Sequence, residues 1–365
     1  MRRRGLIGLA VAGAGAVVAA ATTGAVVERR VVRARRAGAR GADRLGGLTG
    51  DVVRVRTDDG IHLHAEVDEV SPYTDDGGAP GDPTIVFVHG YALNLECWHF
   101  QREHLRGKHR LVFYDQRSHG RSERSSDEHA TIDQLGDDLV RVLAEVVPEG
   151  PVVLVGHSMG GMTVMAFAER HPALFASRVA GVALISTTAG GLKTYQVLGK
   201  LVPDRVGGQV GPRVVAALAR APQLVDTVRR RGSDIGFLVA DRFAFGDDVP
   251  ASYVEFVDNM LAATPFEVLA QFFPNFDALD KYTALERFGT VPTYVVTGTS
   301  DVLTSVGLSR KMASMINGSR LVEFEGAGHM VILERADGVD QALDDLVADA
   351  VAPPTTPATP TPAAP

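Results

Sequence analysis

A serine between two glycines stands at the point where an apolar run gives way to a helical pattern. The run Pro151-Val152-Val153-Leu154-Val155 has the length and β-branched content of a buried strand. The segment from Gly161 to Ala168 has the pattern of a helix, and Gly156-His157-Ser158-Met159-Gly160 joins the two. A sharp strand-to-helix turn lifts the hydroxyl of its serine above the edge of the sheet. Ser158 is therefore the candidate nucleophile.

The glycines of this turn have a physical reason. A serine that projects from such a turn has a strained backbone, and a β-carbon two positions before or after it would collide with the neighbouring strand or helix. Gly156 and Gly160 remove both collisions. The helix that starts after Ser158 also directs its N–H groups and the positive end of its dipole at the reacting centre. The backbone N–H of Met159 is accordingly the first expected donor to an oxyanion.

Two later strands each lead to a polar residue that complements Ser158. A nucleophilic serine needs a base, and the base needs a carboxylate to fix its tautomer. The strand predicted at 292–297 is followed by a polar turn that ends at Asp301, the candidate acid. The strand predicted at 320–324 is followed by a glycine-rich loop that holds His329, the candidate base. Since each of the three residues follows a predicted strand, we expect them at one edge of the sheet.

The ten other histidines are weaker candidates for the base. The side chain of His157 is expected to point away from Ser158 along the turn. His89 and His119 are predicted to be structural loop residues that hydrogen-bond to backbone groups near the site. The remaining seven lie in segments without a matching strand end, namely His62, His64, His99, His104, His109, His129 and His171.

These motifs resemble the α/β-hydrolase superfamily, in the branch whose members carry a helical cap. That branch includes serine esterases and lipases, carbon–carbon bond hydrolases and cofactor-free haloperoxidase-type enzymes. The resemblance runs from about Thr57 to Leu346, and serine, aspartate and histidine follow one another in the chain order of that family's active site. It implies that the residue after His89-Gly90 supplies the second oxyanion donor, here the backbone N–H of Tyr91.

The sequence departs from the family pattern at one loop, and its nucleophile distinguishes between activities found in this branch. The segment from Asp115 to Ser122 resembles the family's Asp-x-Arg-Gly-x-Gly-x-Ser loop, with Ser118 where the family has glycine. The detailed conformation of this loop is therefore left open. Epoxide hydrolases and dehalogenases of the same branch use aspartate as nucleophile, so the serine at position 158 disfavours these two activities.

Strands and helices alternate along the chain as a layered α/β fold requires. A hairpin is predicted from 52–56 and 61–67, and further strands at 84–88, 111–114, 151–155, 180–186, 292–297 and 320–324. The predicted fold is a doubly wound, mostly parallel sheet of eight strands, with the α/β-hydrolase core at 51–186 and 290–350.

Between 187 and 289 the alternation gives way to a helical pattern, and a helical cap is expected there, inserted after the sixth strand. Phenylalanine is concentrated in this segment of a chain that is only 6% aromatic. Most of these rings are expected to pack within the cap, and some to face the cleft and make it apolar. They are Phe237, Phe243, Phe245, Phe256, Phe266, Phe272, Phe273 and Phe276.

Length and composition bound the remaining possibilities. At 365 residues, 45% of them hydrophobic, the chain is long enough to bury one large core. Cys97 is its single cysteine, which rules out an intramolecular disulfide, a zinc cluster of cysteines and the usual thiol active sites. We expect Cys97 to be a small buried residue on the first helix. The predicted site requires neither a metal nor an organic cofactor.

The first 50 residues have a charge pattern of their own. Ten arginines against Glu28 and Asp43 give them a net charge of +8, which leaves −15 for the rest of the chain and argues against nucleic acid as a partner. Residues 6–27 contain no charged side chain and suffice to cross a bilayer as a helix. A membrane anchor followed by a basic linker is therefore expected at 1–50. The alternative is an exported protein whose signal peptide is cleaved near Ala19-Ala20-Ala21.

The two ends of the chain leave the side of the membrane open. The arginines that follow the apolar run favour a cytoplasmic catalytic domain, whereas Arg2-Arg3-Arg4 before it also fits an export signal. Residues 351–365 are rich in proline and threonine and are predicted to form a disordered tail.

The expected activity is that of a serine hydrolase that cleaves a carboxylic ester with a hydrophobic acyl or alcohol part through an acyl-enzyme. The same Ser-His-Asp triad also supports carbon–carbon hydrolysis or perhydrolysis. A non-catalytic relative that uses the pocket for ligand binding or signalling is the third alternative, because fold alone does not fix function. The oligomeric state is open.

Overall fold

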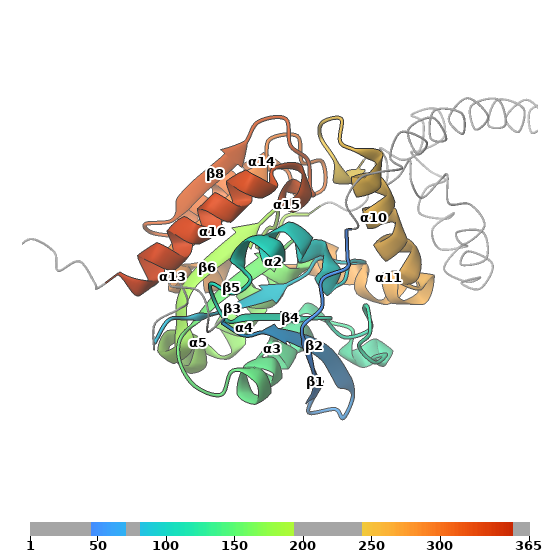
Figure 1. Cartoon of the computed structure of the whole chain (residues 1–365), viewed down its shortest axis with the longest axis vertical. Helices are drawn as coiled ribbons and strands as arrows, with labels where there is room; N and C mark the ends of the chain where they lie inside the picture. Colours follow the sequence, from blue (N-terminus) through green and yellow to red (C-terminus); the bar gives the residue numbers. More distant parts are fainter. Residues whose placement is uncertain (1–44, 71–80, 193–242, 353–365) are drawn as a thin grey trace, which may run out of the picture.

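One eight-stranded sheet forms the centre of the molecule. The computed structural model describes residues 45–70, 81–192 and 243–352 (Figure 1). The strand order is β1-β2-β4-β3-β5-β6-β7-β8. Its strands are β1 (Asp51–Arg56), β2 (His62–Asp68), β3 (Thr84–Val88), β4 (Leu111–Tyr114), β5 (Val152–His157), β6 (Val179–Ile185), β7 (Thr293–Gly298) and β8 (Arg320–Phe324). Only the pairs β1–β2 and β2–β4 are antiparallel, so the predicted mostly parallel sheet is confirmed.

Both faces of the sheet are covered, because successive strand residues enter different apolar clusters. Val86 and Val88 of β3 belong to one cluster, whereas Ile85 and Phe87 belong to the other. On the first face lie α3 (Ile132–Val146), α4 (Met159–Arg170), α5 (Pro172–Arg178), α13 (Leu285–Phe288) and α14 (Val306–Met315). On the second lie η1 (Leu95–Trp98), α2 (His99–Leu105), α15 (Val331–Glu334) and α16 (Ala336–Val351). Cys97 is fully buried in η1.

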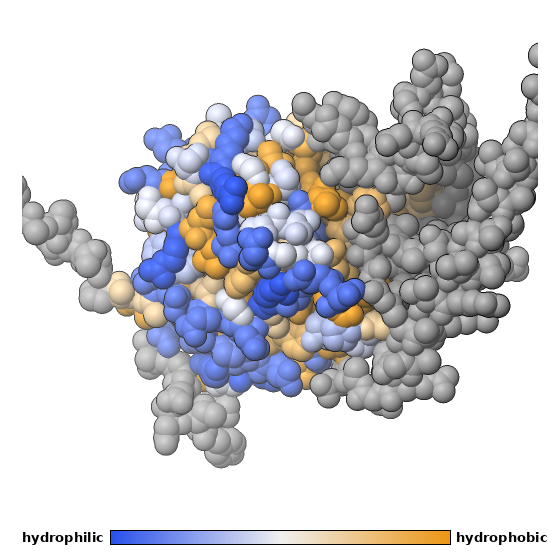
Figure 2. Space-filling model, turned by 90° about the horizontal axis from the view of Figure 1, so that it is seen from above, coloured by the Kyte–Doolittle hydropathy of each residue, from blue (hydrophilic) through white to orange (hydrophobic). Residues whose placement is uncertain are grey.

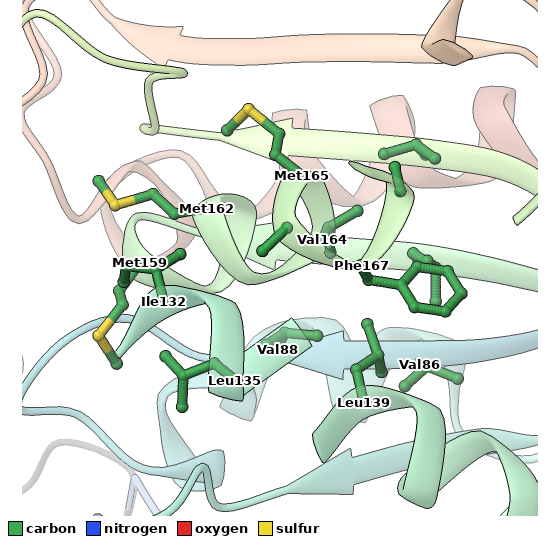
Figure 3. Packing of buried hydrophobic residues seen from close by; sticks show 14 of the residues in the cluster. Val86, Val88, Ile132, Leu135, Leu139, Met159, Met162, Val164, Met165 and Phe167 are labelled. Carbon is green, nitrogen blue, oxygen red and sulfur yellow. The ribbon is translucent and has the colours of Figure 1, made fainter. Parts of the chain in front are cut away.

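Helix α4, which follows the candidate nucleophile, is the most enclosed helix of the first face. All its residues from Met159 to Ala168 are buried. Figure 3 shows side chains of α4 packed in one cluster with Leu135 and Leu139 of α3 and with the strand β3. The strand-to-helix turn is therefore anchored on both sides by packed apolar groups, which hold it far more rigidly than a surface loop.

Helices also fill the interval between β6 and β7. They are α10 (Ala251–Ala263), α11 (Phe266–Phe272), α12 (Pro274–Ala278) and the short η3 (Tyr282–Ala284), which precedes α13. Helix α10 packs into the apolar cluster of the second face, and α11 and α12 pack into that of the first. The predicted helical residues at 198–239 lie outside the described residues, so the cap boundaries at 187 and 289 stay predictions.

The expectation of a membrane-anchored protein is corrected. In 45–70, 81–192 and 243–352, no helix is long and apolar enough to cross a bilayer. The run 6–27 itself lies outside the described residues, as do the tail residues from 353 onward. Freedom from charge was too weak a criterion, because alanine and glycine dominate this run and leucine is scarce.

Polar side chains cover much of the face shown in Figure 2, with apolar residues in smaller groups between them. Among the described residues, the large apolar side chains that are well exposed are Val52, Met315 and Val351. Scattered residues of this kind are ordinary on a folded protein and mark no interface.

Candidate active site

Ser158 has the strained backbone that its position in the turn predicts. Its φ is 53° and its ψ is −118°, outside the regions that non-glycine residues normally occupy. Two hydrogen bonds hold it there: its N–H donates to the carbonyl of Ile185 in β6 at 2.9 Å, and its carbonyl accepts from the Thr187 hydroxyl at 2.6 Å. Such a conformation costs of order 1–3 kcal/mol and persists only where the surroundings enforce it.

The two glycines of the turn are required by close backbone packing. A β-carbon at Gly156 would lie 2.7 Å from the carbonyl of Gly160. A β-carbon at Gly160 would lie 2.0 Å from the carbonyl oxygen of Val88 in β3. Neither backbone can give way, so any larger residue would displace α4 from the sheet and move Ser158 with it.

Asp301 and His329 lie beside Ser158 at the carboxyl edge of the sheet. The Nε2 of His329 is 2.9 Å from Ser158 Oγ, and its Nδ1 is 2.9 Å from Asp301 Oδ2. A carboxylate only accepts, so the imidazole donates from Nδ1 and presents the lone pair of Nε2 to the serine hydroxyl. The three residues are thus brought together from strand ends as far as 171 residues apart in the chain.

Asp301 is held as a carboxylate by donors on both of its oxygens. Oδ1 accepts from the N–H groups of Leu303 and Thr304 at 2.8 and 2.9 Å, and Oδ2 accepts from the Thr304 hydroxyl at 2.7 Å. Burial raises the pKa of Asp301, but the charge of His329 and these hydrogen bonds outweigh burial, so the pKa is lowered. Sequence reasoning missed Thr304, although a hydroxyl three residues after a turn aspartate is a signal of such a contact.

His157 has a role that the sequence did not reveal. Its Nε2 lies 3.0 Å from the backbone carbonyl oxygen of His329, which can only accept, so Nε2 carries the proton. Its ring centroid lies 5.0 Å from that of His329. Burial, with repulsion from His329 second, lowers the pKa of His157 to about 3. His157 is therefore a neutral donor that fixes the backbone of the candidate base.

His89 and His119 are buried and hydrogen-bond to backbone, as predicted. His89 donates from Nδ1 to the Gly90 carbonyl at 2.7 Å and accepts at Nε2 from the N–H of Gln116 at 2.9 Å. His119 donates from Nδ1 to the Arg117 carbonyl at 2.9 Å. Burial lowers the pKa of His89 to about 4 and that of His119 to about 3, so both are neutral at pH 7.

The loop after β3 lies against the serine turn. A β-carbon on Gly90 would lie 2.9 Å from His157 Nδ1 and 3.1 Å from Ser158 Cβ, so glycine permits the approach. Tyr91 follows directly, and its hydroxyl donates to the Leu269 carbonyl of α11 at 2.5 Å. Its ring meets that of Phe276 in α12 edge-to-face at 5.0 Å. The oxyanion role of the Tyr91 and Met159 N–H groups stays a prediction.

Ser118, which stands where the family has glycine, keeps the glycine-like backbone. Its φ is 66°, in the left-handed region. Its hydroxyl accepts from the N–H of Ser125 at 2.9 Å. The neighbouring Arg117 is fully buried and paired with Asp138 and Asp59 at 2.6 and 2.9 Å. The loop thus reaches the conformation that glycine would adopt, with a side-chain hydrogen bond to offset the strain.

In the part of the chain that the structure describes, no group of three or more His, Cys, Asp or Glu side chains is arranged to hold a metal ion. A model for the alpha/beta hydrolase fold family matches residues 83–336, most of the chain and all three converging residues. The chain belongs to the α/β-hydrolase family.

Relatives within the family carry several names. An uncharacterized protein of Mycobacterium tuberculosis is 26% identical over 69% of this chain and 71% of its own length. A non-heme chloroperoxidase of Kitasatospora aureofaciens is 28% identical over 69% of this chain and 87% of its own length. The crystal structure of an enol-lactonase from Burkholderia xenovorans, 26% identical, superposes with a TM-score of 0.63 over 81% of this chain and all of that protein. This α/β-hydrolase is therefore similar to proteins that are named as a lactonase and as a chloroperoxidase.

Proposed function

We propose that this protein is a serine hydrolase that cleaves carboxylic esters through an acyl-enzyme. The observation that carries the proposal is the pair of contacts that His329 makes. Its Nε2 lies 2.9 Å from Ser158 Oγ, and its Nδ1 lies 2.9 Å from Asp301 Oδ2. A neutral imidazole whose lone pair faces a serine hydroxyl is arranged for general-base catalysis. The enol-lactonase name of the superposed structure adds support, since a lactone is an internal ester.

The reaction would proceed in two halves. His329 Nε2 accepts the proton of Ser158 as Oγ bonds to the substrate carbonyl carbon, and Asp301 stabilises the resulting imidazolium. The N–H groups of Tyr91 and Met159 bind the oxyanion. The bond to the alcohol then breaks, and the alcohol leaves with the proton from His329. Water repeats the sequence with the same base and releases the acid, which restores Ser158.

We also propose that the helices between β6 and β7 form a cap over this site and bind an apolar part of the substrate. Tyr91 already contacts this layer through Leu269 and Phe276, so the loop predicted to bind the oxyanion lies under α11 and α12. Buried aromatic rings from the same helices, Phe272 and Phe276, lie on that side of the sheet. A site covered by such apolar helices favours substrates with a hydrophobic acyl or alcohol group.

The decisive experiment compares Ser158→Ala with Ser177→Ala, an exposed serine of α5. Hydrolysis of a series of p-nitrophenyl esters and labelling by a fluorophosphonate are measured on both. We expect Ser158→Ala to lose labelling and to lose several orders of magnitude in kcat, while Ser177→Ala keeps both. Retained hydrolysis and labelling in Ser158→Ala would exclude this serine as the nucleophile. Labelled wild-type protein without turnover of any ester would favour the non-catalytic alternative.

Perhydrolysis is a second candidate, favoured by the resemblance to a non-heme chloroperoxidase. Hydrogen peroxide would then replace water as the acceptor of the acyl group, with Ser158 in the same role. Measuring how the acyl group partitions between acid and peracid at increasing peroxide concentration separates the two readings. Peracid as the main product at millimolar peroxide would assign this activity.

A further inference from the structure

A short segment just before α10, Ala244–Asp247, packs directly on the loop that carries His329. The N–H of Met330 donates to the Ala244 carbonyl at 2.7 Å. A β-carbon on Gly246 would lie 2.1 Å from the carbonyl oxygen of Gly326, and one on Gly328 would lie 2.4 Å from the nitrogen of Gly246. The two backbones therefore touch over the residues just before the candidate base, and glycine on each side makes this possible.

One carboxylate joins these two backbones. Glu334, the last residue of α15, accepts from the N–H of Gly328 at 2.7 Å with Oε1. The same side chain accepts from the N–H of Gly246 at 3.1 and 3.2 Å and from that of Asp247 at 3.3 Å. Both oxygens of a half-buried carboxylate are thus used, and every donor is a backbone group with a fixed direction.

Arg335 strengthens the contact from outside. Its guanidinium donates to the Glu325 carbonyl at 3.0 Å and pairs with the carboxylate of Asp247. The adjacent residues Glu334 and Arg335 therefore hold the same two segments, one through N–H groups and the other through oxygens. The loop that carries His329 has this external support in addition to the bond from His157 on its inner side.

We propose that Glu334 is a positioning residue for His329, and that through it the segment Ala244–Asp247 sets the alignment of the base with Ser158. The inference rests on the proposed function, since it concerns the base of the same triad. Glu334 touches neither Ser158 nor the imidazole in the described contacts. It acts through the backbone of Gly328, the residue next to His329, and a shift of about 1 Å in a base costs up to a hundredfold in rate.

The first test exchanges Glu334 for glutamine. An amide keeps one acceptor oxygen but turns its NH₂ toward N–H donors, so at least one of the backbone contacts is lost. The matched control is Glu323→Gln, which removes the ion pair of a partly exposed β8 carboxylate with Arg310. For each variant, kcat and KM for a p-nitrophenyl ester are measured against pH, per active site titrated with a fluorophosphonate.

We expect Glu334→Gln to lower kcat per titrated site by roughly ten- to hundredfold, with KM changed by less than about threefold. The acid limb of its rate profile should move to lower pH, because misalignment weakens the contact between His329 Nδ1 and Asp301 Oδ2. Glu323→Gln should match wild type. A merely structural role would reduce the number of active sites and leave both kcat per site and the limb in place, and this result would overturn the proposal.

The second test reaches the same contact from the other segment. Gly246→Ala places a methyl group against the backbone of Gly326 and pushes the segment Ala244–Asp247 away, while every residue of the His329 loop is kept. The control is Gly307→Ala in α14, where a β-carbon has no neighbour closer than 4.0 Å. We expect Gly246→Ala to shift the acid limb as Glu334→Gln does. If Glu334→Gln fails to fold, Gly246→Ala alone decides, and a wild-type profile there overturns the proposal.

The two proposals fail separately. Loss of labelling and turnover in Ser158→Ala, together with wild-type behaviour of Glu334→Gln and Gly246→Ala, would leave the serine hydrolase in place and reject the positioning role. Retained turnover in Ser158→Ala would reject the hydrolase mechanism itself, whatever the Glu334 variants do.

Discussion

His157 donates a hydrogen bond from Nε2 to the backbone carbonyl oxygen of His329 at 3.0 Å. The residue directly before the candidate nucleophile thus holds the residue that is proposed to deprotonate it. Because His157 is the last residue of β5 and precedes the turn, this hydrogen bond ties the base directly to the strand that carries the nucleophile. Side chains outside the contacts between Ser158, His329 and Asp301 therefore help to align the site.

This contact predicts the behaviour of His157→Phe. Phenylalanine keeps the ring volume but leaves the buried carbonyl of His329 without its donor, which costs about 1–3 kcal/mol. We expect kcat per titrated active site to fall by roughly tenfold or more, since the base is displaced. The control His171→Phe exchanges a half-buried histidine that contacts Asp137 away from the site. Equal rates per active site in the two variants would contradict the prediction.

Thr304 is predicted to tune Asp301. In Thr304→Val the hydroxyl that donates to Asp301 Oδ2 is lost, so the pKa of Asp301 rises relative to wild type. The loss of one hydrogen bond to a charged group is worth about 1.5 kcal/mol or more, which corresponds to roughly a tenfold decrease in kcat/KM. Thr304→Ser keeps the hydroxyl and should stay near wild type. A valine variant as active as the serine variant would show that the hydroxyl is dispensable.

The left-handed backbone of Ser118 predicts an order of stabilities for two variants. Ser118→Gly relieves the strain and loses the hydrogen bond from Ser125, and these effects of about 1 kcal/mol each nearly cancel. Ser118→Ala loses the hydrogen bond and keeps the strain. We expect urea unfolding to show the alanine variant less stable than the glycine variant by roughly 1 kcal/mol. The reverse order would mean that the strain is not present in solution.

Three buried neutral histidines predict acid sensitivity of the fold. The pKa values of His89, His119 and His157 are lowered to about 4, 3 and 3, so between pH 6.5 and these values the unfolded chain binds more protons than the folded one. The contribution of these three neutral rings to the free energy of unfolding is therefore nearly full at pH 7, and it is lost as the pH falls below about 6.5. Near pH 5 the slope approaches ~4 kcal/mol per pH unit if all three contribute fully.

Urea unfolding at pH 7 and pH 5 measures this effect. In His157→Phe one of the three titrating groups is absent, so the loss of unfolding free energy between the two pH values should be about one third smaller than in wild type. A free energy of unfolding that does not change between pH 7 and pH 5 would show that these rings are protonated in the folded state.

The sheet and the three converging residues were predictable because their signals are local. Runs such as 152–157 and 293–298 are apolar, β-branched and bounded by turn residues, and a parallel sheet places every strand end at a common edge. Asp301 and His329 needed only that edge and their order in the chain to be chosen. A sequence pattern is sufficient to locate such residues when the sheet topology brings the strand ends together.

The supporting contacts were not predictable in the same way. The bonds of His157 to His329, and of Glu334 to Gly246, join residues 172 and 88 positions apart through side-chain directions that no periodicity encodes. The membrane anchor rested on a different signal, the freedom from charge of a run rich in alanine and glycine, and the described part of the chain has no helix that could cross a bilayer. Patterns therefore located the three converging residues and missed the contacts that hold them.

The strands on either side of the helical interval, β6 and β7, are hydrogen-bonded neighbours in the sheet, with Ile185 opposite Val296. A chain that departs from one strand and re-enters on the next makes no demand on the length of what lies between. The sequence between β6 and β7 can therefore be replaced as a unit while the pairing of these two strands keeps its register. Under the proposed cap role, selectivity for the acid and alcohol parts of a substrate can accordingly diverge by exchange of this interval, while the three converging residues stay in place.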